Sequence, residues 1–345
     1  MRTIIVIIAC AMATSCGSES ASQGPADSSS DTSDTTAMDA SGDDTAASDL
    51  TNDDGPGLPD AQDLEPEVSP VVWVPGTPVQ AEVFLSKAQV GKVEGLAFDG
   101  QSTLYLTATN GDIIEVKADG TSSVVATVPA VDGFPSANLA GATYSPQWGP
   151  LFVQYSGDRL YSYSPQDGLK LIREDLAKGP NGILAASNGK LYISLSETGT
   201  VVELDSPDGT MRVITDSVSF PNGLAFRKAT NTLYVASTMP KGEIFTLDLN
   251  SSPATPVLYC NSSDIKAADG LVFAPDGHLL VAAFGAGKVV AIDPDDGNIT
   301  AMVSQEPANA LGGVASLAFG SGEGFDPTCL FATNMLMGGL LKICP

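Results

Sequence analysis

The 345-residue sequence is poor in histidine, cysteine and basic residues. His278 is its only histidine, and 16 Lys and Arg stand against 41 Asp and Glu, which gives a formal net charge of −25. A chain this acidic lacks the basic face that nucleic acid requires, so we expect no nucleic-acid partner. One histidine and five cysteines without zinc-type spacing also exclude most histidine-based catalysis and a Cys/His zinc cluster.

Long apolar runs are scarce as well. The run Ile4–Met12 follows a positive Arg2 and precedes small residues, which is typical of a secretion signal, and it is too short to span a bilayer. The segment Ala13-Thr14-Ser15-Cys16 resembles a bacterial lipobox. We therefore predict a lipoprotein-type signal peptide over residues 1–16, lipidation of Cys16, and an exported protein anchored in the bacterial cell envelope by lipid alone. The alternative is an ordinary signal peptide with a chance cysteine.

Residues 17–70 have almost no large apolar side chains, with 14 acidic residues and no Lys or Arg. Such a segment cannot bury enough apolar surface to offset its ordering entropy, and its like charges repel. We predict an acidic disordered linker, with an acidic cation-binding tail as the alternative.

Three cysteines remain after the signal: Cys260, Cys329 and Cys344. Export favours oxidation. The runs "TCLFATN" and "GLLKICP" can pair as a hairpin that brings Cys329 opposite Cys344, which predicts a disulfide between them. Cys260 is then expected to be buried and unreactive.

From about residue 90 the sequence repeats with a period of roughly 40 residues. The six units begin "VEGLAF" (93), "LAGATY" (139), "GPNGIL" (179), "FPNGLAF" (220), "AADGLVF" (267) and "GVASLAF" (313). Most continue with three further β-rich runs separated by Asn-Gly or Asp-Gly turns. Four short strands per unit predict an all-β, six-bladed β-propeller of four-stranded antiparallel blades over residues 79–345. The alternative fold is a β-sandwich. We expect the protein to be a monomer.

The last unit ends after three strands, while "QAEVFL" at residues 80–85 precedes the first unit without a blade of its own. We predict that this N-terminal strand completes the sixth blade and closes the ring, which removes an open sheet edge.

One residue precedes the repeated glycine in each unit, at the start of the strand that lines the central channel of a propeller. These six residues, here called the ring residues, are Glu94, Ala140, Asn181, Asn222, Asp269 and Ala315. They can be strand-start or turn caps, since Asn-Gly and Asp-Gly are common turn pairs, but Glu is not a turn former. Two carboxylates on one axis repel unless a cation lies between them. Four oxygen-bearing side chains predict a hard divalent cation, with Ca²⁺ favoured and Mg²⁺, Mn²⁺ or Zn²⁺ as alternatives.

At these residues the chain resembles the gluconolactonase/regucalcin (senescence-marker-protein) propellers, on the motifs "VEGLAF", "GPNGIL", "FPNGLAFRKATNTLYVAS" and "ADGLVFAPDGHLLVAAF". The resemblance implies metal ligands at Glu94, Asn222 and Asp269, with Asn181 contacting substrate and bound water. That family often carries an Arg where Gly179 stands here, and Glu197 is a candidate replacement for the lost substrate contact.

The resemblance implies a metal-dependent hydrolase that acts on a small lactone or related ester at the channel mouth. Asp269 is the candidate for taking the proton of the attacking water. The alternative is a non-catalytic cell-surface binding module in which the divalent cation is structural.

Overall fold

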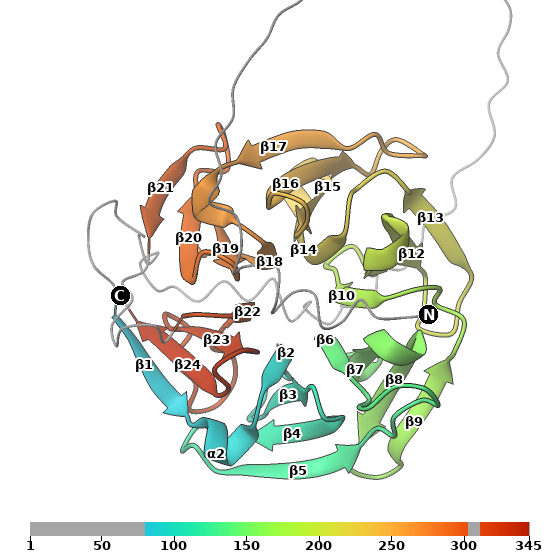
Figure 1. Cartoon of the computed structure of the whole chain (residues 1–345), viewed down its shortest axis with the longest axis vertical. Coiled ribbons are helices and arrows are strands. Elements are labelled where there is room, and N and C mark those ends of the chain that lie inside the picture. Colours follow the sequence, from blue (N-terminus) through green and yellow to red (C-terminus); the bar gives the residue numbers. More distant parts are fainter. Residues whose placement is uncertain (1–79, 303–310, 345) are drawn as a thin grey trace, which may run out of the picture. The chain divides into compact units, whose positions relative to one another are not determined.

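The protein is described by a computed structural model that covers residues 80–302 and 311–344. In this described part the strands form six four-stranded antiparallel sheets, which follow one another around a ring (Figure 1). The sheet order confirms the predicted six-bladed β-propeller and rules out the β-sandwich. The signal peptide with Cys16 and the acidic linker lie outside the described residues.

Each of the first three blades is built from consecutive strands, with the first strand nearest the axis (Figure 1). Blade 1 contains β2 (Val93–Phe98), β3 (Leu104–Ala108), β4 (Asp112–Val116) and β5 (Ser122–Thr127). Blade 2 contains β6 (Leu139–Ser145), β7 (Gly149–Gln154), β8 (Arg159–Ser164) and β9 (Gly168–Arg173). Blade 3 contains β10 (Pro180–Ala185), β11 (Leu191–Leu195), β12 (Thr200–Leu204) and β13 (Met211–Thr215).

The last three blades continue this order until the ring closes. Blade 4 contains β14 (Pro221–Arg227), β15 (Thr232–Ser237), β16 (Glu243–Asp248) and β17 (Val257–Asn261). Blade 5 contains β18 (Ala268–Phe273), β19 (Leu279–Ala283), β20 (Lys288–Ile292) and β21 (Ile299–Met302). Blade 6 contains β22 (Val314–Phe319), β23 (Leu330–Asn334), β24 (Leu340–Cys344) and β1 (Gln80–Leu85).

The N-terminal strand closes the ring as the sequence predicts. β1 pairs antiparallel with β24, from Gln80 opposite Cys344 to Leu85 opposite Leu340. The chain then enters blade 1 through α2 (Lys87–Val90), the one α-helix in the described residues. No helix in that part is long and apolar enough to cross a bilayer.

The hairpin turns contain the Asp-Gly and Asn-Gly pairs that the sequence predicts at these places. Between β4 and β5, Gly120 has a φ of +82°, and the carboxylate of Asp119 accepts a hydrogen bond of 2.8 Å from the Thr121 N–H. Between β10 and β11, Gly189 has a φ of +76° and the Asn188 side chain accepts a bond from the Lys190 N–H. Gly adopts positive φ without a steric penalty, which is why these pairs recur between strands.

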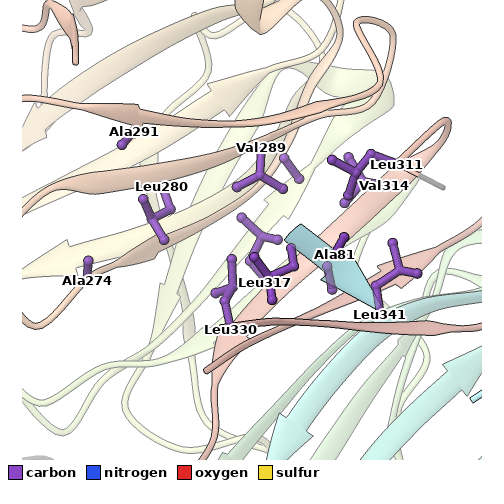
Figure 2. Packing of buried hydrophobic residues seen from close by; sticks show 13 residues of the cluster. Ala81, Ala274, Leu280, Val289, Ala291, Leu311, Val314, Leu317, Leu330 and Leu341 are labelled. Carbon is purple, nitrogen blue, oxygen red and sulfur yellow. The ribbon is translucent and has the colours of Figure 1, made fainter. Parts of the chain in front are cut away.

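Apolar side chains from neighbouring blades meet to form the core. Figure 2 shows the cluster between blades 5 and 6, where Leu280 and Val289 of blade 5 face Leu317 and Leu330 of blade 6. Ala81 of β1 belongs to the same cluster, so the closing strand adds buried apolar contact as well as backbone pairing. Every blade depends on both neighbours for burial, which makes the ring one folding unit.

The cysteines take the predicted places. Cys329 and Cys344 form a disulfide that joins the start of β23 to the end of β24. Cys260 in β17 is free and buried, and burial raises the pKa of its thiol. A buried neutral thiol is a poor nucleophile.

Candidate active site

The six ring residues lie in a repeated irregularity of the inner strands β2, β6, β10, β14, β18 and β22. In β2 the pairing with β3 shifts register between Val93 and Leu96, so Glu94 and Gly95 form a bulge. The equivalent shift occurs at the same place in the other five blades. A bulge releases a residue from the ladder and re-aims its side chain. The acidic or amide residue and its glycine therefore lie within a strand and not in a hairpin turn.

The repeated glycine is required because the inner strands approach each other closely. A Cβ atom at Gly95, Gly141, Gly182, Gly223 or Gly270 would lie 2.1–2.5 Å from the carbonyl oxygen of the ring residue in the next blade. No side chain fits at that distance. The sixth blade has Ser316 at this position. Five of the six ring residues are thus packed against the glycine of the preceding blade, and Glu94 follows the blade that carries Ser316.

Hydroxyl groups fasten three of these junctions. The Thr107 hydroxyl accepts the Gly95 N–H at 2.7 Å and donates to the Ala140 carbonyl at 2.5 Å. Ser194 makes the same bridge from Gly182 to the Asn222 carbonyl, with both contacts at 2.7 Å. Thr333 likewise accepts the Ser316 N–H and donates to the Glu94 carbonyl. We call these three residues the bridging hydroxyls. Two of the bridges hold the backbone of Glu94 and Asn222 in place.

The side chains of Asn222 and Asp269 contact each other. The Asn222 amide donates to Thr238 Oγ1 at 3.1 Å and also hydrogen-bonds the Asp269 carboxyl. Thr238 in turn donates to the Ala268 carbonyl at 2.8 Å. Since the amide nitrogen is committed to protein partners, the carbonyl oxygen is the atom of Asn222 that can bind a cation.

The two carboxyls sit in an enclosed, mutually repulsive pair. Burial raises the pKa of Glu94 to about 8, although part of the residue remains accessible from the channel. Burial also raises the pKa of Asp269 well above its usual range, the Glu94 charge raises it further, and the Asn222 hydrogen bond opposes the rise. Such a pair needs protons or a cation to be stable.

These donors fit a hard divalent cation. Glu94, Asn222 and Asp269 supply only oxygen ligands. Among the described residues no group of three or more His, Cys, Asp and Glu side chains could hold a metal ion, so a cation here depends on the Asn222 oxygen beside the two carboxyls. Asn181 is the fourth polar ring residue and is 7% exposed. Below the ring a cavity of about 240 Å³ is lined by the inner strands of all six blades and reaches Asn222.

Glu197 lies beside the ring and not in it. It belongs to η2 (Ser196–Thr198), the 3-10 turn after β11, and its residue is exposed. Its Cγ packs 3.0 Å from the place a Cβ would take at Gly179. Among the described residues, Glu197 does not contribute to the pKa of either ring carboxyl.

Sequence reasoning missed Tyr155. This residue begins η1 (Tyr155–Gly157), the 3-10 turn after β7, and its phenol interacts electrostatically with Glu197, Glu94 and Asp158. The available signal was the parallel between "QYSGD" in blade 2 and "LSETG" in blade 3, which both end a second strand. His278, by contrast, is in the turn between β18 and β19, at the end of β18 away from Asp269, and is half-buried.

Comparison with known proteins identifies the family of the chain and structures with a similar fold. Residues 94–326 match the family described as SMP-30/Gluconolactonase/LRE-like region. No curated protein matches in sequence. A gluconolactonase from Xanthomonas campestris has a TM-score of 0.63 at 20% identity, covering 84% of this chain and 97% of that one. A calcium-binding regucalcin from Agrobacterium tumefaciens has a TM-score of 0.60 at 20% identity, covering 77% and 94%. Virginiamycin B lyase from Staphylococcus aureus has a TM-score of 0.57 at 14% identity, covering 77% and 99%. At these identities the likeness shows the fold.

Proposed function

Because this chain belongs to the SMP-30/gluconolactonase/LRE-like family, we propose that it is a metal-dependent hydrolase of a small lactone or related ester. One observation carries the proposal. Two carboxyls, Glu94 and Asp269, share the channel ring with Asn222. Among the described residues, no Lys or Arg contributes to the pKa of either carboxyl, so their negative charges are not compensated by a basic side chain. The relatives named gluconolactonase and calcium-binding regucalcin support the same reading.

Glu94, Asn222 and Asp269 would hold the cation, and Ca²⁺ suits their mixed carboxylate and amide oxygens. When bound, a divalent cation polarises a carbonyl and acidifies water. The bridging hydroxyls Ser194 and Thr333 keep the backbones of Asn222 and Glu94 fixed, so the ligands are organised before anything binds.

The reaction assigns a separate task to each side chain. The oxygen of a water molecule bonds to the lactone carbonyl carbon, the ring C–O bond breaks, and a hydroxy acid results. Asp269 receives the water's proton and returns it to the departing alkoxide oxygen. The Asn222 hydrogen bond orients the Asp269 carboxyl for this exchange. Asn181, on the inner strand that neighbours the strand of Asn222, holds the substrate.

The location in the cell is a separate proposal. We propose that Cys16 is lipidated and that the acidic segment 17–70 tethers the propeller to a membrane of the bacterial envelope. Small molecules, and not nucleic acid, would then be the partners of a monomeric domain.

A panel of lactones and esters assayed with and without chelator, together with elemental analysis of bound metal, tests the function. We expect hydrolysis of at least one lactone, its loss on chelation and its recovery with Ca²⁺. Metal-loaded protein inert toward every compound would favour the binding-module alternative. Protein without affinity for any divalent cation would remove the metal ring.

A further inference from the structure

We propose that Tyr155 determines the specificity of this site and selects uncharged lactones over lactones that carry a carboxylate. The inference deepens the proposed hydrolase function and rests on it. It is carried by how the Tyr155 phenol is packed beside the ring and by which charges surround it.

Tyr155 is held at the channel by its own blade. It follows β7, where its backbone N–H donates to the Asn138 carbonyl at 3.0 Å. Its side chain packs against the apolar cluster shared by blades 2 and 3, which contains Leu195 and Ile183. The ring residue of blade 2 is Ala140, so this blade sends only a methyl group into the ring. Tyr155 is the larger side chain that blade 2 places near it.

Gly179 provides the space for the phenol. A Cβ at Gly179 would lie 3.1 Å from Cζ and 3.2 Å from Cε2 of Tyr155, and 3.0 Å from Cγ of Glu197. Gly179 has a φ of +73°, and its N–H donates to the Asp158 carboxylate at 3.0 Å. A Cβ at 179 would require the Tyr155 phenol or the Glu197 side chain to shift by a few tenths of an ångström. Because Gly179 precedes Pro180 and Asn181, the hydroxyl end of Tyr155 stands next to the point where Asn181 joins the ring.

The charged groups that act on the phenol are all acidic. Burial raises the pKa of Tyr155 far above its usual value, and Glu197, Glu94 and Asp158 raise it further. The phenol hydroxyl can donate a hydrogen bond to a molecule beside the ring. A dication can balance Glu94 and Asp269, which leaves the carboxylates of Glu197 and Asp158 as further negative groups near the phenol.

This environment defines the substrate class. A neutral lactone can accept a hydrogen bond from the Tyr155 hydroxyl and lay its ring against the aromatic face. A lactone with a free carboxylate would bring a third negative group next to Glu197 and Asp158. Like charges close together disfavour binding. The site should thus discriminate by charge more than by ring size.

The test compares two lactones with the same ring, one neutral and one carrying a carboxylate, on four proteins. Wild type should prefer the neutral lactone by at least about tenfold in kcat/KM. Tyr155→Leu should lose about tenfold on the neutral lactone, mostly through KM. Glu197→Gln should raise kcat/KM for the charged lactone relative to the neutral one. The control is Tyr163→Phe, a half-buried tyrosine of the same blade that interacts with Glu115. Unchanged selectivity in Tyr155→Leu would overturn the inference.

A second measurement does not depend on turnover. Terbium is a luminescent stand-in for Ca²⁺ that nearby tyrosines excite. Because Tyr155 interacts with Glu94, Tyr155→Phe should remove most of the tyrosine-excited terbium emission while Tyr163→Phe leaves it in place. Equal emission from both variants contradicts the placement of Tyr155, whereas no terbium binding by any of the proteins would contradict the metal ring. Failure of every protein on every lactone would instead refute the proposed hydrolase, whatever the terbium result.

Discussion

Asp269 has the most demanding place among the ring residues, since its carboxyl must serve as ligand and as proton acceptor. The Asp269 carboxyl hydrogen-bonds Asn222, and the Glu94 charge raises its pKa. The residue is 7% exposed. An amide in its place keeps a coordinating oxygen but cannot accept the water's proton. The two tasks are therefore separable by one substitution.

We expect Asp269→Asn to lower kcat by about 10²–10⁴-fold while part of the metal affinity remains. Kinetics on the best lactone and elemental analysis of the same preparation measure the two quantities. Asp295→Asn is the matched control, since that aspartate of blade 5 has an 85% exposed side chain. Full activity in Asp269→Asn would show that another group takes the proton.

Glu94 gives the cation-free protein a characteristic pH dependence. A carboxyl whose pKa is raised by folding stabilises the folded state while it is protonated, and this contribution is lost as pH rises from its ordinary 4.5 through about 8. With chelator, Tm should fall as pH rises from about 5 to about 8, and Glu94→Gln should reduce the slope. Ca²⁺ added at the alkaline end should raise Tm again by binding the folded state. A Tm that does not change with pH in wild-type protein with chelator would contradict the burial of the Glu94 and Asp269 carboxyls.

At the scale of the strand, the bulge and the bridging hydroxyls explain how the ring is built. Thr107, Ser194 and Thr333 occupy equivalent places in β3, β11 and β23 and join each blade to the next. Their bonds are made to the backbone of ring residues. Loss of one bridge should therefore disturb the site and the fold together.

Ser194→Ala would leave the Gly182 N–H without its partner, which should cost about 1–3 kcal/mol of unfolding free energy. It should also weaken metal binding, since the Asn222 carbonyl loses the same hydroxyl. Denaturant titration and calorimetric metal titration provide the two numbers. Ser123→Ala on the exposed face of β5 controls for removal of a hydroxyl. Normal metal affinity in Ser194→Ala would confine the bridge to a structural role.

The strands and hairpin turns could be predicted wherever the local sequence determines the secondary structure. Asn-Gly and Asp-Gly turns and alternating apolar runs fix hairpins, so the blades and the closing strand at residues 80–85 could be predicted. The bulge at Glu94 and Gly95 could not, because an extra residue in one strand is defined only by its pairing with β3. Tyr155 escaped for a similar reason. Its proximity to Gly179 and Glu197 arises across the gap between two blades, and no spacing along the chain records it.

At the scale of the molecule, ring closure couples the first described strand to the last. β1 covers the edge of β24 and adds Ala81 to the cluster between blades 5 and 6. Removing it exposes an unpaired edge and apolar surface.

Truncation at Val90 should therefore unfold the propeller or lower its Tm steeply, whereas truncation at Val68 leaves β1 in place and should preserve the wild-type Tm. Thermal unfolding by circular dichroism compares the two. Equal melting temperatures would refute closure by β1.

Cys16→Ser tests the proposed anchor on the full chain. Without the thiol there is no site for lipid, so we expect the protein to leave the membrane fraction or to remain unprocessed. Fractionation and the mass of the mature protein report this, with Cys10→Ser as the control for a cysteine within the signal. Normal processing and membrane retention of Cys16→Ser would contradict the lipobox.

The pairing of Gln80 with Cys344 has a mechanical consequence. A pulling force that arrives from the N-terminal side of the propeller meets the ring at the outermost strand of blade 6, where β1 can be peeled from β24. The load cannot pass directly into the end of β24, because the Cys329–Cys344 disulfide clamps that end to β23. Under tension β1 is thus the strand that yields first, and the covalent clamp keeps β24 joined to β23.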